Sequence, residues 1–218
     1  MKPESDVLPL VEGALLDPGL TGAQVQERVE KWVALGIRRV LAFPSFLSGL
    51  DAGAHPSLTF TGAVSFPNGC STLASKRMEL LECERLGAKA ATVVLTPGLV
   101  LGSEAAALEK EMSALLSTAQ GLQVRFLVDV AGTPEASMIL LFRLLKESRP
   151  SHLVTAGGLY GAPCGPDKVS WVRARLARKV QIQACAGVAD SSRARAYLKA
   201  GSDLLLTPEP EALAGVAP

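Results

Sequence analysis

Short apolar segments alternate with longer amphipathic segments along the whole chain. The apolar segments carry hydrophobic residues at consecutive positions, and most of them end at a Gly or Pro. Such runs predict strands that are buried on both faces, as in a parallel sheet covered by helices. We expect eight strands, over residues 7–16, 39–43, 58–66, 90–95, 123–130, 151–156, 180–184 and 203–206.

Most of the predicted strands are followed by a segment whose hydrophobic residues have helical spacing. Val25, Val29 and Trp32 recur at intervals of four and three residues, between Thr21 as N-cap and Gly36 as the stop. Further helices are expected at 71–86 (with Ser71 as N-cap), 103–119, 133–147, 166–178 and 190–199, and at most a short helix within 45–57.

Strict alternation over eight units is typical of a (β/α)₈ barrel, an α/β fold also called a TIM barrel. The chain has 218 residues, fewer than the roughly 250 usual for this fold, so the loops must be short. No linker or shift in composition divides the chain, and we expect one domain over 1–218. A doubly wound open sheet is the alternative, but eight units fit the barrel better.

The composition narrows the class of protein. Hydrophobic residues make up 48% and charged residues 20%, which is typical of a globular chain. Lys and Arg total 22 against 21 Asp and Glu, and this near-neutral balance argues against a nucleic-acid or anionic-membrane binder. No apolar run approaches the roughly 20 residues that cross a bilayer, and the first residues lack a signal-peptide pattern.

The cysteines and tryptophans suggest a reduced, packed interior. Four cysteines without a CxxC pair favour a cytoplasmic protein with neither a disulfide framework nor a zinc motif. Cys70, Cys164 and Cys185 fall in or near carboxyl-end loops. They are either a cluster of functional thiols or ordinary small buried residues. Trp32 and Trp171 are expected to pack on the barrel wall or to form a homodimer contact.

A barrel enzyme works at the carboxyl ends of its strands, and the candidate residues are taken from there. No metal or cofactor is expected, because the two histidines, His55 and His152, fall at the amino-terminal rim. No lysine lies inside a predicted strand, and Lys168 is the only helical lysine considered close enough to reach the mouth. The catalytic candidates are Glu12, Thr92, Asp129, Gln183 and Cys185, and the ligand-binding candidates are Thr155, Gly157, Gly158, Tyr160, Gly187 and Thr207.

Each group of candidates has a structural alternative. Glu12 and Asp129 are either an acid–base pair at one mouth or carboxylates paired with the backbone, with Arg125 or with a lysine. Gln183, Thr92 and Thr155 either line a neutral pocket or bond to one another. The loop 157–161 is either a ligand cover, with Tyr160 as its lid residue, or a plain turn.

Six segments carry recognisable motifs: Val11–Pro18 (VEGALLDP), Val64–Gly69 (VSFPNG), Gly87–Val94 (GAKAATVV), Leu153–Gly158 (LVTAGG), Ile182–Val188 (IQACAGV) and Ala200–Asp203 (AGSD). In collinear order, these segments resemble those of the deoxyribose-phosphate aldolase family. The resemblance implies a class I aldolase barrel, in which a strand lysine forms a Schiff base, a second lysine lowers its pKa, and an aspartate assists proton transfer.

The residues that the resemblance assigns to these roles have changed. The Schiff-base lysine corresponds to Val154, the second lysine to Gln183 and the aspartate to Thr92, while the strand-two cysteine of the family corresponds to Leu41. At the implied phosphate site, Asp190 follows Gly187, and Pro208 removes an N–H donor after Thr207.

These differences leave two hypotheses for function. The first is a protein that is not catalytic as an aldolase and that binds a small carbonyl or sugar-like ligand, or a protein partner. The second is an active lyase or isomerase on a small sugar-like substrate, with altered chemistry based on Glu12, Asp129 and Cys185.

Overall fold

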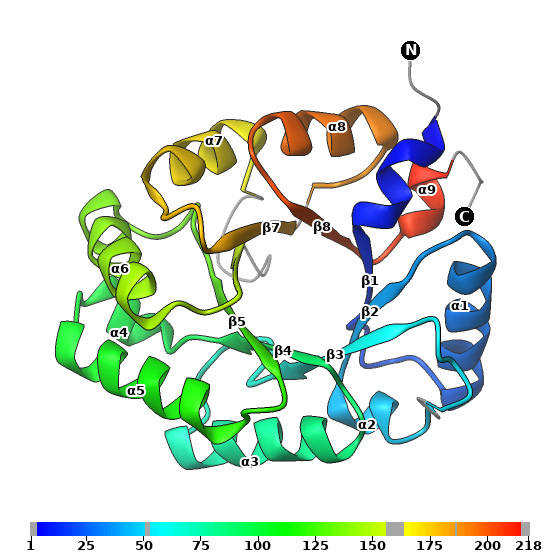
Figure 1. Cartoon of the computed structure of the whole chain (residues 1–218), viewed down its shortest axis with the longest axis horizontal. Helices are drawn as coiled ribbons and strands as arrows, with labels where there is room; N and C mark the ends of the chain where they lie inside the picture. Colours follow the sequence, from blue (N-terminus) through cyan, green and yellow to red (C-terminus); the bar gives the residue numbers. More distant parts are fainter. Residues whose placement is uncertain (1–3, 51–52, 156–163, 186, 215–218) are drawn as a thin grey trace.

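The computed structural model describes residues 4–50, 53–155, 164–185 and 187–214. Eight parallel strands close into a barrel in sequential order, and β1 pairs with β8 to complete the ring. Figure 1 looks along this barrel and shows the helices outside the ring of strands. The strands are β1 Val11–Leu15, β2 Arg39–Ala42, β3 Thr59–Val64, β4 Ala90–Val94, β5 Gln123–Val128, β6 His152–Thr155, β7 Gln181–Cys185 and β8 Leu204–Thr207. The expected (β/α)₈ barrel is confirmed.

The helices follow the strands as the hydrophobic spacing predicts. The major helices are α1 Gly22–Ala34, α3 Leu73–Arg85, α5 Ala105–Thr118, α6 Glu135–Ser148, α7 Pro166–Arg175 and α8 Ser191–Lys199. Thr21 caps α1 in a capping box with Gln24, as expected for an N-cap. The expected N-cap Ser71 is wrong by one residue, because the Thr72 hydroxyl accepts the hydrogen bond from the Ser75 N–H.

The first predicted strand is too long. Residues Glu4–Leu10 form the 3₁₀ helix η1, and β1 begins only at Val11. Val7 and Leu8 are both buried, as on one side of a helical turn rather than on the alternating faces of a strand. Three short helices that begin at a proline complete the fold: α2 Pro44–Leu47, α4 Pro97–Leu101 and α9 Pro210–Leu213. Helix α9 contacts η1, and Figure 1 shows the two side by side.

The outer face of the barrel packs closely against the helices. Trp32 of α1 is fully buried over Gly13 of β1, where a Cβ would lie 2.4 Å from the indole ring. Its Nε1–H donates to Glu211 at 2.9 Å. Trp32 is therefore a barrel-wall residue and not a dimer contact. Trp171 packs against Phe142 on the outside of the ring, with their ring centroids 5.5 Å apart.

Candidate functional site at the carboxyl ends of the strands

A polar layer crosses the interior of the barrel. It consists of Glu12, Thr61, Arg125 and Gln183, from β1, β3, β5 and β7, which is the alternate-strand arrangement of a barrel layer. The Glu12 carboxylate accepts hydrogen bonds from Thr61 Oγ1 at 2.6 Å, from Arg125 Nη1 at 2.7 Å and from Gln183 Nε2. All four side chains are buried. Glu12 is therefore an enclosed, fully bonded anion.

An apolar layer lies above the polar one, toward the carboxyl ends. Leu41 and Val154 are completely buried at its centre. They form one cluster with Ala14, Ala63, Val94, Leu127 and Leu206. This cluster, here called the apolar plug, separates the Glu12 network from the mouth of the barrel.

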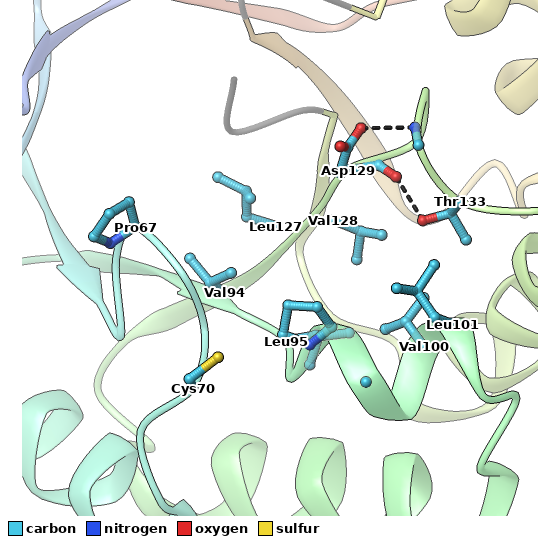
Figure 2. A pocket seen from close by; sticks show the side chains of 13 residues that line it. Pro67, Cys70, Val94, Leu95, Val100, Leu101, Leu127, Val128, Asp129 and Thr133 are labelled. Carbon is cyan, nitrogen blue, oxygen red and sulfur yellow. Dashed lines mark hydrogen bonds between the residues drawn. The ribbon is translucent and has the colours of Figure 1, made fainter. Parts of the chain in front are cut away.

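Described residues line two cavities at the mouth. The axial cavity, of about 440 Å³, lies over the plug residues Ala14, Leu127 and Leu206, and its polar lining includes Asp17, Arg28 and Cys185. The outer cavity, of about 410 Å³, lies to one side among the loops that follow β3, β4 and β5. Figure 2 shows this outer cavity, with the Val94, Leu127, Val128 and Leu101 side chains among those that line it and Asp129 near one edge.

The proposed acid–base pair is not assembled. Glu12 is sealed beneath the plug and bonded to Arg125, which is the structural alternative considered for it. Asp129 lies two residues beyond Leu127 and lines the outer cavity, while Cys185 lines the axial one. The three residues of the altered-chemistry hypothesis therefore occupy three different environments.

Among the described residues, Gln183, Thr92 and Thr155 do not line one common pocket. Gln183 belongs to the buried polar layer. Thr92 is buried, and its hydroxyl has no hydrogen-bond partner among the described residues. Thr155 faces outward, on the side opposite to Val154 and toward the helices. Short strands that are apolar on both faces give no alternation from which to read these directions.

The remaining ligand-binding candidates have mixed outcomes. Gly187, with φ of 74°, lines the axial cavity as expected for a mouth residue. Thr207 faces away from the cavity, and its buried hydroxyl donates to the Val188 carbonyl at 3.2 Å. Gly157, Gly158 and Tyr160 lie outside the described residues. The Arg28 guanidinium, which reaches the axial cavity from α1, was missed because α1 is distant in sequence from Gly187.

A buried lysine near the mouth was also missed. Lys76 of α3 is completely buried, and its ammonium donates to Glu111 at 2.6 Å, to the Val94 carbonyl at 2.9 Å and to Thr96 Oγ1 at 3.0 Å. All three of its N–H donors are thus used. Lys168, the lysine considered from sequence, instead lies 5.6 Å from the Trp171 ring on α7. The buried face of α3 (Lys76, Leu80 and Cys83) has spacings of four and three residues, a signal that could have identified Lys76.

None of the four cysteines forms a disulfide. Cys83 is buried against Gly62, and burial raises the pKa of its thiol to about 12. Burial also raises the pKa of the Cys164 thiol. Cys70 and Cys185 line different cavities. Within the described parts of the chain, no group of three or more His, Cys, Asp or Glu residues is arranged to hold a metal ion.

His152 lies at the amino-terminal end of β6, as expected from the sequence. The Ser151 hydroxyl donates to the Val124 carbonyl, so Ser151 Oγ accepts from His152 Nδ1–H at 3.0 Å. This assigns the proton of the neutral ring to Nδ1. Burial, with a further contribution from the positive charges of Arg125 and Arg39, lowers the pKa of His152 from 6.5 to about 3.

Acid is therefore expected to destabilise the fold through His152. Between pH 6.5 and about 3, the unfolded chain binds a proton here that the folded chain does not. Lowering the pH from 7 to 4 should cost about 3 kcal/mol of unfolding free energy from this group. Urea unfolding of the wild type and of His152→Gln over this range measures the contribution. An equal loss of stability in both proteins would contradict it.

The fold defines the chain as a (β/α)₈ barrel, with cavities at the carboxyl ends of its strands. Among the described residues, no helix is long and apolar enough to cross a membrane. Comparison with models of known protein families finds no match.

The chain is similar to deoxyribose-phosphate aldolases over nearly its whole length. It is 25% identical to the aldolase of Picosynechococcus over 94% of this chain and 89% of that protein. It is 24% identical to the aldolase of Microcystis aeruginosa over 93% and 89%, respectively. The resemblance inferred from the sequence motifs is confirmed.

Solved structures show the same fold. An aldolase called QR15 superposes with a TM-score of 0.91 at 20% identity, over 96% of this chain and 95% of that one. The deoxyribose-phosphate aldolase of Aeropyrum pernix, described as tetrameric, superposes with a TM-score of 0.89 at 19% identity, over 98% and 91%.

Proposed function

We propose that this chain is a ligand-binding relative of the deoxyribose-phosphate aldolases that does not carry out Schiff-base chemistry. The observation that carries the proposal is the apolar plug. Val154, which corresponds to the Schiff-base lysine by resemblance, is fully buried within it. A class I mechanism needs an amine that is accessible to the carbonyl carbon of the substrate, and valine has none.

The surroundings of Val154 support the same conclusion. Gln183, at the position of the second lysine, is hydrogen-bonded to Glu12 and Arg125 below the plug. It carries no charge with which to lower the pKa of a neighbouring amine. Lys76, the one buried lysine of the described residues, donates to three acceptors, so its amine has no free donor or lone pair for attack.

The axial cavity is the proposed binding site for a small carbonyl or sugar-like molecule. It offers the Arg28 guanidinium, the Asp17 carboxylate and the Cys185 thiol above an apolar floor. Hydroxyl and carbonyl groups of such a ligand are complementary to these donors and acceptors. A cytoplasmic location and assembly with further copies of the chain remain part of the proposal, the latter supported by the tetramer described for the Aeropyrum pernix relative.

Reductive trapping tests the chemical part of the proposal. We expect that incubation with deoxyribose 5-phosphate and sodium borohydride leaves the intact mass of the chain unchanged. The aldolase of Microcystis aeruginosa is the positive control. A substrate-dependent covalent adduct on this chain would overturn the proposal, and peptide mapping would identify the lysine responsible.

Thermal unfolding with the same sugar phosphate, with free deoxyribose and with glyceraldehyde tests the binding part. A dose-dependent rise in Tm is expected for at least one of them, because a ligand that binds only the native state stabilises it. The rise should disappear in Cys185→Trp, which fills the axial cavity. If none of these compounds changes the Tm, the proposed ligand class is wrong.

A further inference from the structure

Arg28 of α1 is an unpaired cation at the edge of the axial cavity. Its side chain is half-buried and lines both this cavity and the groove between α1 and the loop after β8. Its guanidinium forms no ion pair and no hydrogen bond with another described residue. Glu211, which lines the same groove, pairs instead with Lys31 at 3.7 Å and accepts a hydrogen bond from Trp32. The N–H donors of the Arg28 guanidinium are therefore accessible to a ligand.

The rest of the axial cavity offers little to compete with this cation. Among the described residues that line it, Arg28 is the only cation and Asp17 is the only anion. Asp17 is exposed, and its Oδ1 accepts a hydrogen bond from the Gly19 N–H at 2.9 Å in the loop after β1. Leu16 and Phe66, both half-buried and packed on the apolar plug, provide apolar walls. The cavity thus suits a small molecule with one anionic end and an apolar body.

The loops after β7 and β8 favour a carboxylate over a phosphate as the anionic end. Barrels of this fold frequently bind phosphate in these two loops, at backbone N–H groups and helix N-termini. Both loops line the axial cavity, through Gly187 and Pro208. The N-terminus of α8 is capped by Asp190, whose own carboxylate accepts a backbone N–H of the first turn at 2.7 Å. After β8, Pro208 has no N–H, and the Glu209 N–H donates to Thr207 Oγ1 at 3.2 Å.

We propose that the axial cavity takes a small oxo acid, with its carboxylate on the Arg28 guanidinium and its carbon chain against Leu16 and Phe66. A guanidinium fork can satisfy both oxygens of a carboxylate through two charge-assisted hydrogen bonds, and the carbon chain gains from leaving water. The inference rests on the proposed function, which supplies the carbonyl group of the ligand, and it adds the carboxylate. Binding involves no covalent step.

Three compounds test the nature of the anionic end: 2-oxobutyrate, 1-hydroxy-2-butanone and deoxyribose 5-phosphate. The hydroxy ketone keeps the carbonyl group and the chain length of the oxo acid but replaces the carboxylate by a hydroxymethyl group. Titration at pH 7, followed by ¹H–¹³C methyl NMR, is expected to show saturable shifts at Ala14, Leu16 and Leu206 with 2-oxobutyrate. The oxo acid should bind about tenfold more tightly than the hydroxy ketone, because its hydrogen bonds to Arg28 are charge-assisted. The sugar phosphate should bind more weakly than the oxo acid.

Four variants test the role of Arg28. Arg28→Gln should abolish the preference for the oxo acid over the hydroxy ketone, and Arg28→Lys, which keeps the charge without the planar fork, should retain part of it. Asp17→Asn removes a repelling charge and should strengthen binding of the oxo acid by about twofold. Lys31→Gln, three residues further along α1 and outside the lining of the axial cavity, is the matched control and should bind the oxo acid like the wild type. The Tm of each unliganded variant checks that the fold is retained.

The outcomes separate this inference from the proposed function. Tighter binding of the sugar phosphate than of the oxo acid, or shifts that map to Leu101 and Val128 of the outer cavity, would overturn the inference. So would an Arg28→Gln protein that retains the preference, or a Lys31→Gln protein that loses it. If the hydroxy ketone binds in the axial cavity as tightly as the oxo acid, the ligand-binding function stands and only the carboxylate inference fails. If neither carbonyl compound binds, the proposed function fails as well.

Discussion

Replacing Arg125 by Met is expected to lower the free energy of unfolding by about 3–5 kcal/mol, because it leaves the Glu12 carboxylate buried without its cation. Glu12 would keep its hydrogen bonds to Thr61 and Gln183, but these do not neutralise the charge. Urea unfolding at pH 7, analysed by linear extrapolation, measures the loss.

The double variant Glu12→Gln/Arg125→Met tests the cause. Removing the unpaired charge while retaining an amide for Thr61 and Gln183 should recover at least half of the lost stability. Arg85→Met, which breaks the exposed Arg85–Glu82 pair, is the control and should be close to the wild type. If the double variant is no more stable than Arg125→Met, the loss is caused by packing of the arginine stem rather than by the buried charge.

Lys76→Met is expected to cost a similar amount, about 3–5 kcal/mol, because Glu111 would then be buried without a counter-ion. This variant should also loosen the outer cavity, since Glu111 holds both the N–H and the hydroxyl of Thr96. The measurements are urea unfolding and the amide hydrogen exchange of residues 96–101.

Lys76→Met/Glu111→Gln provides the comparison. It should regain stability, because no unpaired charge remains, and it should regain protection at Thr96, because the side-chain amide oxygen of the introduced glutamine can still accept its N–H. Slow exchange at residues 96–101 in the single variant would show that the loop is held by α4 itself and not by the ion pair.

Much of the fold was predictable because it follows from patterns along the chain. Eight short apolar runs, separated by segments with helical spacing, indicate a parallel sheet covered by helices. The strict alternation of these strands and helices then indicates a barrel. The first strand was misplaced because Val7 and Leu8 are as apolar as a strand but belong to a turn of 3₁₀ helix. Helices α4 and α9 were missed because four or five residues after a proline are too few for a periodic signal.

The candidate site was harder to predict because it depends on which way each side chain points. Val154 and Thr155 are neighbours on one strand, yet one lies in the plug and the other faces the helices. Glu12 lies in the first predicted strand, so its place in the barrel was predictable. Its hydrogen bonds were not, because they depend on Arg125, which extends across the interior to the Glu12 carboxylate. The helical spacing of α3 places Lys76 on its buried face, but the contacts of its ammonium depend on how α3 packs against β4, which no local pattern contains.

The apolar plug also has a consequence for the evolution of the sequence. It separates the charged network that stabilises the barrel from the mouth cavities that contact a ligand. Substitutions at distant sites without shared partners act almost independently on stability. The mouth can therefore accumulate replacements without weakening the interior.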